Sequence, residues 1–172
     1  MTYRLSIDGF VRKLRGMDKE IEGAVVKGFQ AAGLVLAAEV PQQIRKTEPH
    51  PAVDTGALGN SVQYTLLPDG CEVAVTAPHA APIENGTRPF WPPSKPLEEW
   101  VLRKGLADSP KEAKRIAFLV RKKIAEQGIA PRRYFRKSWI ASRRRMHAEV
   151  RRELKLLGYG KVRVRSTKSF DD

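Results

Sequence analysis

The sequence contains very little of what would mark it as disulfide-bonded, zinc-binding or membrane-spanning. Its single cysteine, Cys71, excludes a disulfide within the chain and has no zinc-ligand spacing with His50, His79 or His147. No uninterrupted apolar run approaches the length of about 18 residues that a membrane-spanning helix needs. The N-terminal residues lack the charged and then apolar layout of a signal peptide. We therefore expect a protein made in a cytoplasm, with no membrane partner.

Sequence motifs of catalysis are also missing. The sequence has no glycine-rich phosphate loop, no HExxH motif, no nucleophile elbow and no acid cluster that would hold catalytic metals. The acids nearest the predicted sheet, Asp54, Asp69 and Glu84, fall in three different turns. We expect a non-enzymatic protein without cofactor or metal, in which Glu84 forms a salt bridge within or between subunits. Motifs that read DNA bases are absent too, which argues against sequence-specific binding.

Positive charge, in contrast, is abundant. The chain has 32 lysines and arginines against 19 acids, a net charge of +13 and a pI near 10.2. This balance predicts a polyanion, an acidic protein partner, or an assembly that encloses nucleic acid, and charge alone does not choose among them. The predicted final helix, residues 134–157, is either a solvated basic face or a surface turned toward DNA or an acidic partner. Its basic-surface candidates are Arg143, Arg144, Arg145, Arg151 and Arg152.

The clearest β-strand signal lies between residues 61 and 77. Val62, Tyr64 and Leu66 alternate with polar residues, and valines alternate again after a Pro-Asp-Gly turn. Two such runs around a short turn predict a β-hairpin. A hairpin alone is marginal in water, so one face needs a covering helix.

Helical periodicity on both sides of the hairpin supplies that cover. Residues 18–40 give the longest predicted helix, with Asp18 as its N-cap and small residues such as Gly28 and Gly33 that allow close packing. Pro41 removes a helix hydrogen bond and should kink or end the helix. The shorter predicted elements are a strand near residues 3–7, a brief helix over 8–16, a helical turn over 78–84, and two helices over 96–103 and 111–127.

Together these elements predict an α+β fold. It consists of a small antiparallel β-sheet packed by a long N-terminal helix, with a helical insertion over residues 92–130 and a basic C-terminal helix. We expect one domain over residues 1–158 and a polar, charged tail over 159–172.

Four sequence features occur in a recognisable order. The loop before the hairpin reads Asp-Thr-Gly-Ala-Leu at 54–58, and residues 78–87 read Pro-His-Ala-Ala-Pro-Ile-Glu-Asn-Gly-Thr. Residues 131–135 read Pro-Arg-Arg-Tyr-Phe before the final helix, and the long N-terminal helix precedes all three. In this order they resemble the tail-completion, or head–tail joining, proteins of long-tailed bacteriophages, including the lambda minor tail protein Z group, over roughly residues 5–155.

This resemblance implies a structural protein of the virion neck, made in the bacterial host cytoplasm and without known catalytic residues. Its expected partners are further copies in a six- or twelve-fold ring, the portal or its connector, and tail terminator or tail tube proteins. Non-specific contact with packaged DNA is a further expectation. The residues expected to form assembly contacts are Asp54, Thr55, Gly56, Glu84, Gly86, Thr87, Arg88, Phe90 and Trp91.

Other interpretations stay open at this point. A non-specific nucleic-acid-binding protein would use the basic final helix, and its affinity would fall steeply with salt. A phage-encoded nuclease or inhibitor would need a metal dependence that the residues do not indicate. The Asp-Thr-Gly stretch could simply be the turn that starts the hairpin, and the aromatic residues of 88–93 could pack on the sheet, on a neighbour or on bases.

Overall fold

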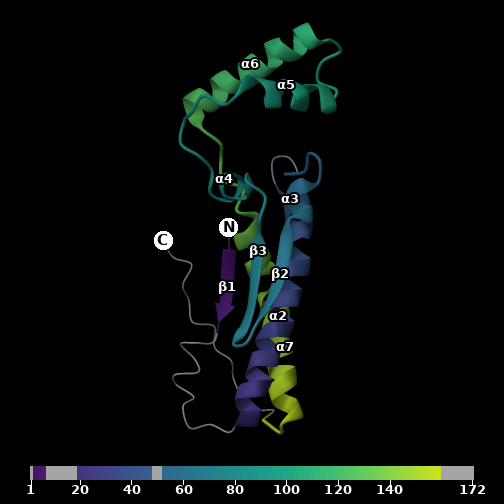
Figure 1. The fold of residues 1–172 in the computed structure, drawn as a ribbon, viewed down its shortest axis with the longest axis vertical. Coiled ribbons are helices and arrows are strands. Elements are labelled where there is room, and N and C mark those ends of the chain that lie inside the picture. The colour runs from purple at the N-terminus through teal and green to yellow at the C-terminus, as the bar shows by residue number, and fades with distance from the viewer. Residues whose placement is uncertain (1, 7–18, 48–51, 160–172) are drawn as a thin grey trace.

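The computed structural model describes residues 2–6, 19–47 and 52–159 (Figure 1). The brief helix predicted over residues 8–16 and the N-cap predicted at Asp18 lie outside these ranges. In chain order the elements are β1 Thr2–Ser6, α2 Lys19–Arg45, α3 Ala57–Asn60, β2 Val62–Leu67, β3 Gly70–Val75, α4 Ala80–Asn85, α5 Ser94–Arg103, α6 Pro110–Gln127 and α7 Tyr134–Leu156. The α+β class predicted from the sequence is confirmed.

The sheet has three antiparallel strands in the order β1-β3-β2. In the hairpin, Val62 pairs with Val75 and Tyr64 with Val73, which is the register that the alternation predicts. The other edge of β3 pairs with β1, where Tyr3 lies opposite Val73. The N-terminal strand expected from its alternation therefore belongs to this sheet, and β3 is its central strand.

Helix α2 covers one face of the sheet and contacts it closely. The hydroxyl of Tyr64 donates to the carbonyl oxygen of Gln30 at 2.9 Å. Gly33 lies so near β3 that an added Cβ would be 2.1 Å from the Sγ of Cys71. Leu66, expected on this covered face, is instead 62% exposed. Its partner in the sheet, Cys71, is fully buried against α2, so only the edge strand β2 leaves its side chain open at this position.

Helix α2 does not end before Pro41, as the predicted range of 18–40 has it, but continues through Pro41 to Arg45. Proline costs a helix hydrogen bond, but Val40 and Ile44 on either side of it are buried in the core and hold this last turn in place. The sequence interpretation of membrane spans also needs correction. By length and composition alone α2 could cross a membrane, with a mean hydropathy of 1.4 over 18 residues. In the fold, however, its apolar face packs inside the protein.

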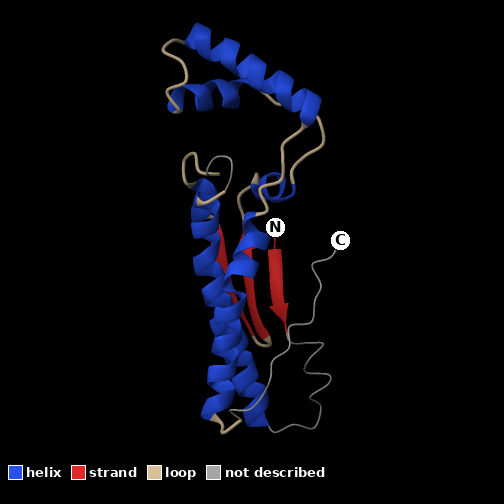
Figure 2. Cartoon of the chain, turned by 180° about the vertical axis from the view of Figure 1, so that it is seen from behind, coloured by secondary structure: helices blue, strands red, loops and turns tan. Residues whose placement is uncertain are grey.

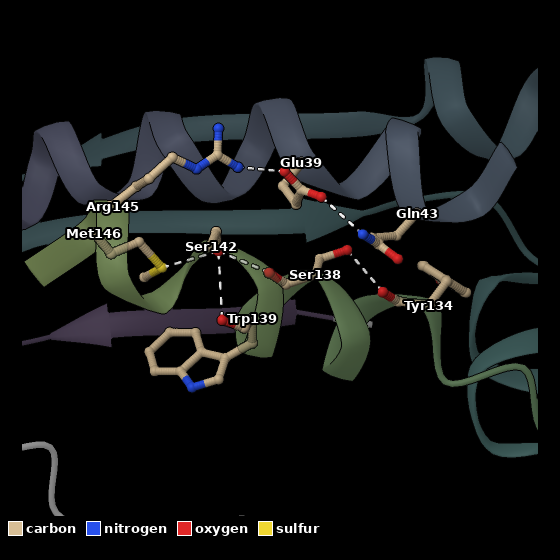
Figure 3. Close-up of polar contacts among 8 residues, drawn as sticks. All are labelled: Glu39, Gln43, Tyr134, Ser138, Trp139, Ser142, Arg145 and Met146. Atoms are coloured by element: carbon tan, nitrogen blue, oxygen red, sulfur yellow. Dashed lines mark hydrogen bonds and ion pairs between the residues drawn. The ribbon is translucent and has the colours of Figure 1, made fainter. Parts of the chain in front are cut away.

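Helix α7 runs antiparallel to α2, and both helices lie on the same face of the sheet (Figures 1 and 2). Gly28 permits the approach, because an added Cβ would lie 2.8 Å from the Cα of Val150. Ser138 and Ser142 are also buried at this interface. Each donates its hydroxyl at 2.7 Å to the carbonyl oxygen four residues earlier, so neither is unsatisfied (Figure 3).

One charged pair bridges the two long helices. Glu39 of α2 is only 6% exposed, and its carboxylate accepts hydrogen bonds from Arg145 of α7 and from Gln43, the latter at 2.8 Å (Figure 3). A carboxylate buried without partners would be costly. This ion pair therefore fixes how α7 lies along α2.

Helices α5 and α6 form a separate helical hairpin, called here the helical lobe, which stands at one end of the body made by the sheet, α2 and α7 (Figures 1 and 2). The lobe has a small core of its own around Val101, Ala113 and Ala117. Ser109 caps α6 by accepting a hydrogen bond from the N–H of Glu112 at 3.2 Å. The chain enters the lobe through residues 86–93 and leaves it through 128–133.

Candidate interaction surfaces

The N-terminus of α7 is capped in an unusual way. Arg133, at the N-cap position, has a left-handed backbone with φ of 54° and no capping hydrogen bond from its own side chain. The cap comes from elsewhere in the chain. Glu84 of α4 places its carboxylate over the helix start and accepts hydrogen bonds from the N–H groups of Phe135 at 2.7 Å and Arg136 at 3.0 Å. An anion suits the positive end of the helix dipole.

Backbone contacts between the same segments extend this junction. The N–H groups of Arg132 and Arg133 donate to the carbonyl oxygens of Ile83 and Glu84 at 2.8 and 3.1 Å. The hydroxyl of Tyr134, which is fully buried, donates to the carbonyl oxygen of Ala80 at 3.2 Å. We call this unit, residues 80–87 with 129–136, the clasp.

Two glycines make the clasp tight. An added Cβ on Gly86 would lie 2.5 Å from the carbonyl oxygen of Ile129, and one on Gly128 would lie 2.2 Å from that of Thr87. Thr87 and Ile129 exchange two hydrogen bonds, the N–H of Thr87 donating at 2.9 Å and its Oγ1 accepting at 3.1 Å. Within one chain, Gly86 and Thr87 join the two connecting segments, and their expected contact with other subunits stays a prediction.

Glu84 requires the clearest correction among the expected contact residues. Its side chain is 3% exposed and both carboxylate oxygens are used within the chain. A neighbouring subunit has no access to it, and a reversal to lysine would disrupt the fold as well as any assembly. The sequence indicated a salt bridge, but the partners are backbone N–H groups at a helix start, 51 and 52 residues away in the chain.

The Asp-Thr-Gly loop contacts the helical lobe. Asp54 pairs with Arg103 at 2.6 Å, and Lys104 donates to the carbonyl oxygen of Val53 at 3.0 Å. The hydrogen bond that Arg103 donates to Asp54 is the main cause that raises the pKa of Arg103 above its usual range. Gly56 has the left-handed φ of 82° that the following short helix α3 needs. Asp54 therefore links the body to the lobe.

Three of the expected contact residues are well exposed around the base of the lobe: Arg88, Phe90 and Trp91. Phe90 is 42% and Trp91 52% exposed. The indole of Trp91 lies edge-on to Phe118 of α6, with ring centroids 6.1 Å apart, and the guanidinium of Arg121 lies 4.9 Å from its centre. Trp91 therefore packs on α6 of its own chain and not on the sheet, which was one of the alternatives left open by the sequence. Their outer surfaces stay open.

The five arginines selected on α7 fall into two groups. Arg145 pairs with Glu39, and Arg152 pairs with Glu149 at 3.1 Å. Within the part of the chain that the structure describes, no acid pairs with the other three, Arg143, Arg144 and Arg151. The partner of Arg145 could not be found from the sequence because it lies on another helix, whereas Glu149 is three residues from Arg152 on α7 itself.

The described residues show little that could hold a small ligand. Among them no group of three or more histidine, cysteine or acidic side chains is placed to bind a metal ion. The two best-defined surface depressions, of about 240 and 340 Å³, are shallow. The smaller lies at the start of α6 beside Ser109 and the larger between the ends of α2 and α7. Both buried carboxylates, Glu39 and Glu84, serve to join elements of the fold.

Comparison of the chain with protein-family models gave no match, and comparison with curated proteins and with solved structures gave none either.

Proposed function

We propose that this chain is a structural protein of a bacteriophage neck, a subunit of a ring that joins the head to the tail. The observation that carries the proposal is the spatial arrangement of the motifs that resemble tail-completion proteins. Residues 78–87 and 131–135 are far apart in the sequence, yet they form the clasp. Residues 54–58 lie at the same end of the body and also contact the lobe.

This arrangement supports a fold shared with the tail-completion proteins rather than a chance match of short sequence patterns. Each motif has a structural task that needs its particular residues: a carboxylate at Glu84 to cap α7, a glycine at Gly86 where a Cβ would collide, and an aspartate at Asp54 to pair with α5. The tasks depend on one another, because Glu84 has no helix start to cap unless residues 131–135 are in place.

Under this proposal the exposed residues at the lobe base form contacts with neighbouring proteins. Interfaces are enriched in aromatic and arginine side chains, and Arg88, Phe90 and Trp91 supply both kinds there. Asp54 and Thr55, which are also exposed, extend this surface toward the body. Subunits of a ring meet through two different patches, so a second contact surface elsewhere on the chain is required.

Electron cryo-microscopy of particles assembled from the genome that encodes this chain tests the proposal directly. We expect a ring of density between portal and tail tube that accommodates the paired helices α2 and α7 and the projecting lobe. Particles that are complete and infectious but lack the chain would contradict the proposal.

A pair of variants then tests the contact surface. Phe90→Ser with Trp91→Ser should leave the purified chain folded and reduce its incorporation into particles at least tenfold. Leu156→Ser is the matched control, since Leu156 is a 75% exposed apolar side chain at the opposite end of the body. Equal incorporation of both variants would show that the lobe base is not a contact surface.

A further inference from the structure

A line of basic side chains runs along the outer side of α7. Lys137, Arg144 and Arg151 follow one another at intervals of seven residues, which is close to two helical turns, and Lys155 follows one turn later. All four are exposed. At 1.5 Å per residue they extend over about 27 Å of helix. We call them the basic row.

Acidic residues are confined to the other side of the helix. Glu149 and Glu153 are half-buried, and both pair with the exposed Arg152. Arg143 borders the basic row and, like Arg144 and Arg151, has no ion pair with any described residue. Among the described residues, no acid therefore forms an ion pair with the arginines of the row or with Arg143.

A neighbouring histidine, His147, is subject to the same positive charge. His147 lies between Arg143 and Arg151, one turn from each. Its pKa is lowered, first by partial burial and then by the charges of Arg151 and Arg143. Positive charge on this side of α7 therefore adds to burial in disfavouring a proton on His147.

The side chains next to the row limit what it could recognise. Ala141 and Ala148 are small and exposed, so the basic groups project beyond them and a flat or rod-like anion can approach closely. The exposed residues include Ile140 but no asparagine or glutamine, the side chains that read adenine edges. The one tryptophan of the helix, Trp139, packs against the core, so the row offers no aromatic platform for unpaired bases.

From this geometry we infer that the outer face of α7 binds the phosphate backbone of double-stranded DNA without sequence preference, through Arg143 and the basic row. Duplex DNA carries one negative charge per about 1.7 Å of its length. The phosphates of a straight duplex can therefore contact the lysine and arginine side chains along the whole row at once. The inference rests on α7 alone and holds for the isolated chain, whether or not the chain is part of a phage neck.

The test measures binding of the purified full-length chain to a fluorescent 20-base-pair duplex by anisotropy, at several salt concentrations. The variant replaces Arg143, Arg144 and Arg151 with glutamine, which lowers the net charge from +13 to +10. We expect at least a tenfold loss of affinity. The slope of log K against log salt should shrink by about 2 to 3, since each lost phosphate contact contributes about 0.9.

A matched control separates the place of the charges from their number. Replacing Lys111, Lys114 and Lys123 on α6 with glutamine removes the same charge from exposed positions on the lobe. We expect this variant to bind within twofold of the unaltered chain, and a second duplex of unrelated sequence to bind within twofold of the first. Circular dichroism should show both variants folded.

Several results would overturn the inference. Equal losses in both variants would mean that net charge alone attracts the DNA. Unchanged binding by the α7 variant would exclude this face. Tighter binding of a single strand, or of polyglutamate, than of the duplex would assign the row to a different partner. Failure of the neck proposal would appear instead as particles without the chain, so the two proposals fail separately.

Discussion

Replacing Glu84 tests the clasp most directly. The change Glu84→Ala removes a carboxylate that is 3% exposed and accepts two backbone hydrogen bonds, from Phe135 at 2.7 Å and Arg136 at 3.0 Å. These bonds connect α4 to the start of α7, the helix that packs along the whole of α2. We therefore expect the substitution to lower the stability of the body as a whole and not to act locally.

The expected loss can be worked out from these two bonds. Hydrogen bonds to a charged group contribute about 1.5–3 kcal/mol each, and loss of an N-cap acceptor costs about 0.5–2 kcal/mol. The two bonds share one carboxylate and are not independent, so we take about 3 kcal/mol for Glu84→Ala. Glu84→Gln keeps one acceptor oxygen but loses the charge, and should cost about half as much.

Urea unfolding followed by circular dichroism measures both losses. With a slope of about 2 kcal/mol per molar urea, Glu84→Ala should lower the midpoint by about 1.5 M. Glu126→Ala is the control, because it removes an equally charged but exposed carboxylate on α6 and should change stability by less than about 0.5 kcal/mol. If Glu84→Ala were as stable as this control, the clasp would not hold α7 in place and the reasoning would be wrong.

Three further outcomes follow from contacts inside the body. Gly33→Ala should lose about 2 kcal/mol of stability in urea by overpacking, and Cys71→Ala in the same chain should recover most of that loss, because the added Cβ would lie 2.1 Å from Sγ. Burial raises the pKa of the Cys71 thiol to about 11, so a thiol reagent at pH 8 should react with it in urea and hardly at all in the folded chain. In an NMR titration His147 should have a pKa below its ordinary value of 6.5, and glutamine at Arg143 and Arg151 should move it upward. Because that pKa is lowered on folding, the contribution of His147 to stability is complete above pH 6.5 and is lost as the pH falls toward the lowered value. If the arginine substitutions left the pKa of His147 unchanged, the two arginines would not lower it.

Local patterns in the sequence were enough to predict the elements and some of their ends. The alternation of Val62 and Tyr64 around a Pro-Asp-Gly turn indicated the hairpin and its register. Gly128 ends α6 as expected, with a positive φ of 70°. These features depend on neighbouring residues in the chain, so the sequence carries the signal for them.

The pairing of distant elements could not be predicted in this way. Periodicity shows which side of a helix is apolar, but the same stripe on α7 fits a sheet, another helix or a neighbouring subunit equally well. Ser138 and Ser142 were missed in the buried stripe because they are polar, although a helix can satisfy their hydroxyls through its own carbonyl oxygens. Spacing by seven residues was the available signal for the basic row and would have added Lys137 to the arginines selected, and Lys155 follows Arg151 one helical turn later.

The correction at Glu84 changes where contacts with other proteins should be sought. A motif can resemble those of an assembling family because its residues build the fold, and the clasp shows this for Glu84, Gly86 and Thr87.

The helical lobe needs support from outside its own two helices. Its helices of 10 and 18 residues enclose a small core, too little for a unit of this size to fold alone.

The lobe therefore depends on its connections to the body for its position. Apart from the connecting chain, the described contacts between lobe and body include the exposed pair Arg103–Asp54, which salt screens readily. A partner that covers Phe90 and Trp91 at the lobe base would add buried apolar surface at this junction and fix the lobe relative to α2 and α7. Binding there would consequently order the orientation of the lobe, whereas binding to α7 would leave it unchanged.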